Sequence, residues 1–181
     1  MPYEYVVISR NCEGIQIPTG NKIMLPKGTQ VRITQSLGGS FTIMTDYGYM
    51  VRILEADGDA IGKKAPSAVK TQEAVEGAPL EKLVWGQLST CYDPEIPINI
   101  VELGLVYECK ITPLPDGGNR INVKMTLTAP GCGMGESIKR DAEAKIHRLP
   151  DVKEVNVEVV WDPPWDQSKM SQAAKLQLGL M

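Results

Sequence analysis

The chain has 181 residues, of which 43% are hydrophobic, and carries a formal net charge of −3. This composition is ordinary for a soluble globular protein, and the acidic balance argues against a nucleic-acid partner, which would favour a basic face. No apolar run is long enough to span a bilayer, and the first residues lack the basic start and long apolar stretch of a signal peptide. We therefore expect a cytoplasmic protein without a membrane or nucleic-acid partner.

The first 54 residues predict an all-β module. Short strand-like runs recur there, separated by turn residues such as Gly38-Gly39 and Asp46-Tyr-Gly48, and this spacing is typical of a small barrel or sandwich. Because this part contains no cluster of titratable groups, we expect a barrel-like module for interaction or scaffolding rather than for catalysis. The runs interpreted as strands are Tyr3–Ser9, Lys22–Leu25, Gln30–Ser36, Ser40–Thr45 and Tyr49–Leu54.

Residues 55–78 differ in composition from what precedes them. Ala, Gly, Lys and Glu dominate, and large apolar side chains are nearly absent. Such a segment buries too little surface to offset its ordering entropy, which predicts a linker. The predicted organisation is a β module at 1–54, a linker at 55–78 and a second domain with a C-terminal tail at 79–181.

The second domain is predicted to begin with a helix at Pro79, because proline suits the first helical position. The helix is expected to end before Asp93-Pro94, since a residue that precedes proline avoids helical geometry. Two alternating segments, 105–111 and 120–128, flank the hairpin signal Asp116-Gly-Gly-Asn119. The apolar face of the first helix comprises Leu80, Leu83, Val84, Leu88 and Cys91.

A second helix is predicted over roughly 134–149 and a third strand over 152–161. A strand–helix–strand order implies a right-handed crossover and parallel pairing. The fold class is therefore α+β, with a two-layer α/β domain that has a three-stranded mixed sheet and helices on one face. Residues 168–180 are interpreted as a last short helix.

Cysteine and histidine usage limits the metal chemistry that the chain can support. No two cysteines stand in Cys-x-x-Cys spacing, and His147 is the only histidine, so sequence-local ligands do not predict a zinc or iron–sulfur site. Cys109 lies on the apolar face of a predicted strand and Cys91 on that of a predicted helix, which favours core positions for both. Cys12 is uninformative, and His147 is expected near the end of the second helix, without a functional role.

Cys132 is the sharpest functional candidate. It lies in the glycine-rich segment Thr128-Ala-Pro-Gly-Cys132-Gly-Met-Gly135, between the end of a predicted strand and the start of a helix. Free amide groups and the positive end of the helix dipole stabilise a thiolate at such a position. The alternative is a small, inert, buried cysteine. Position alone leaves these two interpretations equal.

The segment Asp93-Pro-Glu-Ile-Pro97 brings two carboxylates close together. Asp93 and Glu95 could serve in acid–base chemistry or bind a hard metal ion. Alternatively, Asp93 caps local backbone amides and Glu95 is solvated, which the sequence alone favours modestly. The aromatic turn Trp161-Asp-Pro-Pro-Trp165 is expected either to cover the site or to close the core.

Taken together, three motifs resemble the metal–sulfur cluster biosynthesis family. They are the stretch from Asp93 to Tyr107, the segment Thr128-Ala-Pro-Gly-Cys132 and the turn Trp161–Trp165. The resemblance covers residues 79–165. In addition, three N-terminal segments resemble the extension of the SufT proteins of this family: Ile17-Pro-Thr-Gly-Asn21, Leu25-Pro-Lys-Gly-Thr29 and Thr34-Gln-Ser-Leu-Gly-Gly-Ser-Phe41.

The resemblance implies an accessory factor in iron–sulfur cluster assembly or delivery, with Cys132 as the motif cysteine. It implies a site formed by Cys132, Asp93, Glu95 and Thr128, with Cys132 as a transient metal ligand. Family members are not known as enzymes. We expect a labile iron–sulfur cluster or iron rather than a tightly bound cofactor, and partners among the assembly machinery, client proteins and a second copy of the chain. The alternatives are an adaptor without cluster contact and a cysteine-dependent enzyme.

Overall fold

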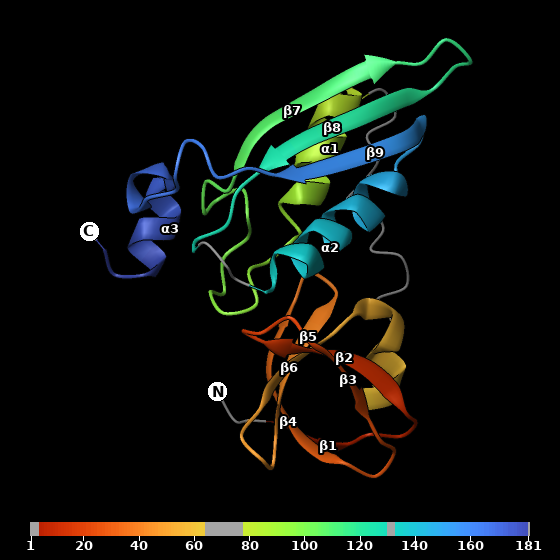
Figure 1. Ribbon diagram of the computed structural model, residues 1–181, viewed down its shortest axis with the longest axis vertical. Helices are drawn as coiled ribbons and strands as arrows, with labels where there is room; N and C mark the ends of the chain where they lie inside the picture. Colours follow the sequence, from red (N-terminus) through yellow and green to blue (C-terminus); the bar gives the residue numbers. More distant parts are fainter. Residues whose placement is uncertain (1–3, 64–77, 130–132, 181) are drawn as a thin grey trace. The chain divides into compact units, whose positions relative to one another are not determined.

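A computed structural model describes residues 4–63, 78–129 and 133–180. The chain divides into two compact units, Met1–Glu76 and Gly77–Met181, which Figure 1 draws from red at the N-terminus to blue at the C-terminus. Each unit has its own hydrophobic core. No helix within the described ranges is long and apolar enough to cross a membrane.

The first unit is a six-stranded antiparallel sheet with the order β1-β4-β5-β6-β2-β3. Its inward side chains, among them Ile43, Val51 and Ile53, are fully buried. The order begins at β1 and ends at β3, and no ladder between these two strands appears in the described residues, so closure into a barrel stays a prediction. The strands are β1 Glu4–Val7, β2 Cys12–Ile17, β3 Lys22–Leu25, β4 Gln30–Leu37, β5 Ser40–Thr45 and β6 Met50–Ile53.

The prediction that a linker begins at residue 55 is wrong. Glu55–Ile61 forms a 3-10 helix, η1, and its residues Ala60 and Ile61 are buried in the core of the first unit. The amide of Ser9 donates a 2.8 Å hydrogen bond to the carbonyl of Ala60, which fixes η1 against the sheet. The first unit therefore extends at least to Lys63, while residues 64–77 of the predicted linker lie outside the described residues.

The second unit contains a three-stranded sheet in which β8 pairs antiparallel with β7 and parallel with β9. The predicted mixed sheet and the parallel crossover through α2 are confirmed. Figure 1 shows both long helices alongside this sheet. The elements are α1 Leu80–Leu88, β7 Val106–Pro113, β8 Asn119–Met125, α2 Gly135–His147, β9 Val152–Val159, η2 Gln167–Lys169 and α3 Gln172–Gln177.

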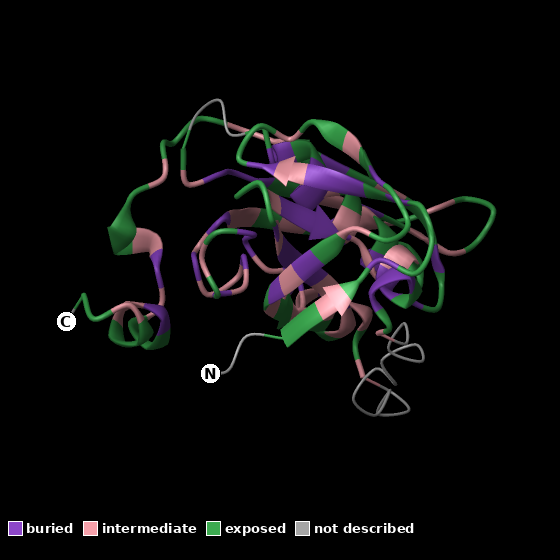
Figure 2. Ribbon diagram, turned by 90° about the horizontal axis from the view of Figure 1, so that it is seen from below, coloured by how far each residue is buried: buried purple, intermediate pink, exposed green. Residues whose placement is uncertain are grey.

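The helices cover one face of this sheet. In β8, Ile121, Val123 and Met125 are buried, whereas Lys124 between them is exposed, as expected for a strand with one covered face. Figure 2 shows buried, intermediate and exposed positions following one another along the same strands and helices. The buried helical side chains of the same core are Val84, Leu88, Ile138, Ala142 and Ile146.

Helix α1 is shorter than predicted, because it ends at Leu88 rather than just before Asp93. The hydroxyl of Ser89 donates to the carbonyl of Trp85 at 2.9 Å, and that of Thr90 donates to Gln87 at 2.7 Å. These bonds satisfy carbonyls of the last helical turn, which have no partner further along the helix. The chain is thereby free to leave the helix before the acidic segment.

The C-terminal segment packs on the connection between α1 and β7. The indole Nε1 of Trp165 donates to the carbonyl of Leu103 at 2.8 Å, and the amide of Ser171 donates to the carbonyl of Glu102 at 2.9 Å. Ser171 also accepts a bond from the amide of Ala174 and so caps α3. The predicted tail helix is present, although it spans only Gln172–Gln177.

Candidate functional site

Cys132 lies outside the described residues, as do Pro130 and Gly131. The described chain reaches Ala129 on one side of them, after the end of β8, and resumes at Gly133, just before α2. Thr128 is half-buried at the strand side. The site is therefore defined here by the segments that flank Cys132 and by the acidic segment.

Of the two predicted carboxylates, Asp93 is buried and Glu95 is exposed. The Oδ1 atom of Asp93 accepts hydrogen bonds from the amides of Glu95 at 2.8 Å and Ile96 at 2.9 Å. This is the capping arrangement that the sequence offered as the alternative to a metal-binding role. A carboxylate fixed in this way holds the turn, while the exposed Glu95 carboxylate remains accessible to solvent.

Backbone hydrogen bonds connect the acidic segment to the strand end that precedes Cys132. The amide of Ile100 donates to Cys91, that of Leu105 donates to Ile100, and that of Thr126 donates to Leu105, at 2.8–2.9 Å. Ligand sites in sheet-and-helix proteins often form at the carboxyl ends of strands. The acidic segment and the strand end that precedes Cys132 therefore belong to one hydrogen-bonded framework. That Asp93 and Glu95 lie close to Cys132 stays a prediction.

The start of α2 is held closely against the end of β8. A Cβ atom on Gly135 would lie 2.5 Å from Cδ1 of Leu127, so a larger residue here would require the Leu127 side chain to shift. The residue before the helix, Met134, supplies no side-chain cap. The first amides of a helix have no partner within it, and the positive end of the helix dipole lies at this end of α2.

The three described cysteines are poor nucleophiles. Cys12 and Cys91 are buried in the two cores, and burial raises the pKa of Cys12. Cys109 packs half-buried against the second core, where burial, and to a smaller extent the charge of Glu81, raises its pKa to about 11. The core positions expected for Cys91 and Cys109 agree with the structure.

Lys145 of α2, which forms a buried ion pair within the helix, also binds the chain just after α1. The ammonium group of Lys145 lies 3.0 Å from Asp141, both side chains are largely buried, and it donates to the carbonyl of Thr90 at 2.8 Å. Because Thr90 lies three residues before Asp93, this contact joins α2, the helix that follows Cys132 in the sequence, to the acidic segment. Sequence reasoning missed Lys145, since an Asp–Lys pair at i and i+4 is usually an exposed helix feature.

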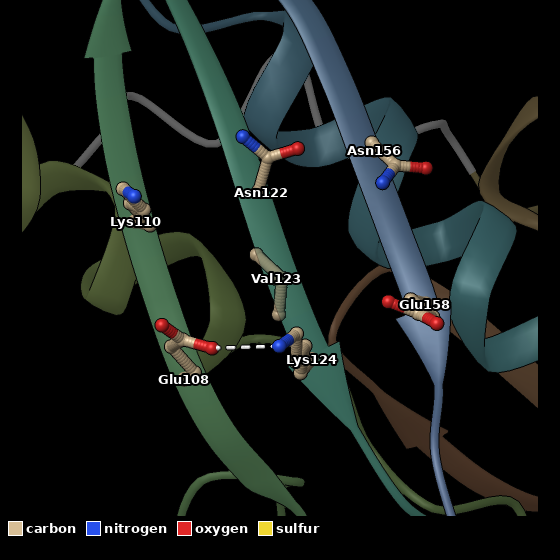
Figure 3. Close-up of a pocket in the computed structure, with 7 residues that line it drawn as sticks. All are labelled: Glu108, Lys110, Asn122, Val123, Lys124, Asn156 and Glu158. Carbon is tan, nitrogen blue, oxygen red and sulfur yellow. Dashed lines mark ion pairs between the residues drawn. The ribbon is translucent and has the colours of Figure 1, made fainter.

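The uncovered face of the second sheet carries a polar hollow. Figure 3 shows Glu108 and Lys124 paired across neighbouring strands, with an oxygen-to-nitrogen distance of 3.2 Å. None of the predicted site residues lines this hollow. It is lined by Glu108, Lys110, Asn122, Val123, Lys124, Asn156 and Glu158.

No group of three His, Cys, Asp or Glu side chains within the described residues could hold a metal ion. His147 is the last residue of α2 and exposed, at the opposite end of the helix from its first residue, Gly135.

In the aromatic turn, Trp161 is exposed, whereas Trp165 is half-buried and its indole nitrogen donates a hydrogen bond to the carbonyl of Leu103. Trp165 packs against the core of the second unit, while a role of the turn in covering Cys132 stays a prediction.

Comparison with known proteins identifies the family of the second unit. The sequence profile described as "Iron-sulfur cluster assembly protein" matches residues 81–159. A Bacillus subtilis relative, "Fe-S protein maturation auxiliary factor YitW", is 38% identical over 101 residues, which are 56% of this chain and 95% of the relative. "Fe-S protein maturation auxiliary factor SufT" of Staphylococcus aureus is 40% identical over 88 residues, which are 49% of this chain and 96% of the relative.

A crystal structure gives the same picture at the level of the fold. The "Domain of Unknown Function DUF59 from Bacillus anthracis" is 37% identical, covers 56% of this chain and 93% of its own length, and superposes with a TM-score of 0.50. The chain therefore belongs to the iron–sulfur cluster assembly protein family and is related to SufT. Because these relatives cover about half of the chain, the N-terminal resemblance to the SufT extension stays a prediction.

Proposed function

We propose that this protein is a cytoplasmic accessory factor that assists the assembly of iron–sulfur clusters or their delivery to client proteins, and that it acts through Cys132. Family membership supports the general role, because the related proteins are described as iron–sulfur protein maturation factors. The observation that carries the choice of residue is the state of the other thiols. Cys12 and Cys91 are buried in the cores and Cys109 is half-buried against the second one, which supports Cys132 as the reactive cysteine.

The cluster or iron ion is cargo in this proposal rather than a resident cofactor. A cluster usually takes four protein ligands, and one cysteine supplies a single one. The remaining ligands come from a partner, from a second copy of the chain, or from labile small molecules. Such incomplete ligation favours release, which suits a factor that hands a cluster to a client. Asp93, Glu95 and Thr128 form the rest of the proposed site.

We further propose that the protein is not a cysteine-dependent enzyme. A catalytic thiol needs a base within hydrogen-bonding reach. The only histidine, His147, ends α2, and a helix of this length places its last residue about 18 Å from its first. The adaptor alternative, in which the β module recruits partners and Cys132 is inert, is separated from our proposal by the reactivity of the thiol.

The decisive experiment is anaerobic reconstitution of the full-length protein with iron and sulfide, followed by absorption spectroscopy and transfer to an apo client. We expect Cys132→Ser to lose cluster association and client maturation while it keeps its thermal stability. The matched control, Cys109→Ser, should keep both activities and lose stability, because Cys109 packs against the core. Normal client maturation by Cys132→Ser would leave the adaptor role as the better account.

A further inference from the structure

Strand β7 lies at an edge of the sheet in the second unit, and solvent reaches it there. Among the described residues its ladder partner is β8, and Figure 1 shows it as the outermost strand of this sheet. The core-facing side chains of Cys109 and Ile111 are half-buried. Their cross-strand neighbours on β8, Val123 and Ile121, are 1% and 0% exposed. An accessible edge strand is a template for pairing with another chain.

The two ends of β7 limit where a partner strand can pair. The ladder with β8 is irregular between Val106 and Glu108. The strand ends at Pro113, whose backbone nitrogen has no hydrogen to donate. Bulges and prolines are devices that block pairing at sheet edges. The stretch Glu108–Thr112 contains neither and pairs regularly with β8, so it is the part of the edge that can accept a partner.

The exposed side chains of this stretch carry opposite charges. Glu108 and Lys110 are successive residues on the uncovered face of β7, as Figure 3 shows, and both are exposed. In an antiparallel pair of β7 strands with Cys109 opposite Cys109, each Glu108 lies opposite the Lys110 of the other copy. Opposite charges in this position stabilise a ladder, and like charges destabilise it.

Charge and face together select this register over its neighbours. A shift by two residues places either Glu108 opposite Glu108 or Lys110 opposite Lys110, which are like-charge pairs. A shift by one residue turns the polar side chains of one copy to the core side of the other. The strand is therefore complementary to a second copy of itself in the register that is centred on Cys109.

We propose that two copies of the chain pair through β7, antiparallel and with Cys109 at the twofold axis, to form one continuous six-stranded sheet. The same surface is used by both copies, as in most symmetric dimers. Main-chain hydrogen bonds hold the two strands together, and two Glu108–Lys110 ion pairs fix the register. This inference goes beyond the proposed function and does not rest on the role of Cys132.

The pairing also covers apolar surface on α1. The charge of Glu81 in α1 contributes to the raised pKa of Cys109, so this helix lies close to the edge strand. Side chains that lie opposite each other in a ladder point to the same face of the sheet, so the helices of both copies lie on one face. Leu80, Leu83 and Trp85 of α1 pack against the core and are only half-buried. A second α1 at the seam buries more of this surface.

Charge reversal tests the register in the full chain. Analytical ultracentrifugation over a range of concentrations, under reducing conditions, gives the Kd of the dimer. Glu108→Lys creates two Lys–Lys contacts and Lys110→Glu two Glu–Glu contacts, so each should raise this Kd about tenfold or more. The double variant exchanges the signs and restores both pairs, and its Kd should return to within about threefold of the original. Glu158→Lys, the same charge change on β9, is the matched control and should leave the Kd unchanged.

Amide hydrogen exchange locates the interface independently. When the unaltered chain is compared below and above its dimer Kd, amides of residues 108–112 should exchange more slowly at the higher concentration. Amides of β9, at the other edge of the sheet, should exchange at the same rate in both samples. In Glu108→Lys the difference at β7 should disappear over the same concentrations.

Three results would overturn the inference. They are a chain that stays monomeric at every concentration, a dimer whose Kd neither single reversal changes, and a dimer that the double reversal does not restore. The proposed function fails separately, when Cys132→Ser still matures clients. A dimer that follows the charge reversals then stands without it, and loss of maturation in Cys132→Ser leaves the function standing for a monomeric chain.

Discussion

Gly104 lies directly against the carbonyl group of Lys169. A Cβ atom at this glycine would overlap the carbonyl oxygen and lie 2.6 Å from the carbonyl carbon, and the backbone of Gly104 has a φ of +68°. Two independent constraints, a left-handed conformation and a close approach of the C-terminal segment, therefore require glycine here. The side chain of Lys169 also lies over the ring of Tyr107, with its nitrogen 4.8 Å from the ring centroid.

The first prediction separates these two constraints. Gly104→Ala should destabilise the protein by about 2–4 kcal/mol, which combines the cost of a left-handed residue with that of overpacking. Gly117→Ala is the matched control, because Gly117 has a φ of +83° and nothing within 4 Å of an added Cβ. It should cost only about 1–2 kcal/mol. Urea unfolding of both variants gives the comparison, and equal losses would show that the contact with Lys169 contributes nothing.

A second prediction concerns pH and Cys109. Burial raises the pKa of this thiol from 9.0 to about 11 in the folded protein. Between these values the unfolded chain loses the proton while the folded chain keeps it, so the unfolded state binds fewer protons and stability falls as the pH rises from about 9 to about 11. Below pH 9 the thiol is protonated in both states and the effect disappears.

Urea midpoints of the reduced protein between pH 8 and pH 11, compared with those of Cys109→Ser, test this effect. The serine variant has no thiol to titrate, so its stability should fall less steeply over the window, and the difference between the two proteins isolates Cys109 from other titrating groups. Parallel curves for the two proteins would mean that the Cys109 thiol is not desolvated.

Much of the second unit was predictable because its periodicity is strong. The helix predicted over roughly 134–149 agrees with α2, whose buried residues Ile138, Ala142 and Ile146 recur at helical spacing. The alternation predicted over 120–128 agrees with the single covered face of the sheet at β8. By contrast, the core role of Ala60 and Ile61 was missed. Two apolar residues in a run of alanine, glycine and charged residues give too little periodicity to signal burial.

The candidate site was less predictable, since its geometry depends on contacts between distant segments. Sequence reasoning offered both a cap and a metal ligand for Asp93, and only the fold shows that its Oδ1 atom holds two local amides. Ser137 and Lys145 look like ordinary surface residues of a polar helix. Both are buried, and Lys145 is buried where α2 contacts the end of α1, which no local pattern encodes.

The third prediction distinguishes the structural and functional parts of the acidic pair. Asp93→Asn keeps an oxygen that can accept the amides of Glu95 and Ile96, and Glu95→Gln changes an exposed group. The double variant should therefore unfold within about 1 kcal/mol of the original protein and still impair client maturation, because both charges are lost. Glu108→Gln with Glu158→Gln, on the polar sheet face, removes the same charge at a distance from the site. Equal maturation by the two double variants would remove the acidic pair from the site.

The last prediction concerns where the first unit ends. Ala60 and Ile61 in η1 fill its core, and the amide of Ser9 donates to the carbonyl of Ala60. A fragment of residues 1–63 should therefore fold alone, whereas a fragment of residues 1–54 should not, because deleting a buried isoleucine side chain already costs about 2–5 kcal/mol in an intact core. Limited proteolysis of the full chain should cut between residues 64 and 77, where the composition predicts a linker.

Circular dichroism and the spread of amide proton chemical shifts in NMR spectra show whether each of the two fragments is folded. A cooperative thermal transition in 1–63 and its loss in 1–54 would establish η1 as part of the folding unit. Ile61→Ala in the 1–63 fragment is the matched test of the contact itself and should lower the thermal midpoint without removing any backbone. If the 1–54 fragment unfolds as cooperatively as 1–63, η1 only rests on a core that is complete without it.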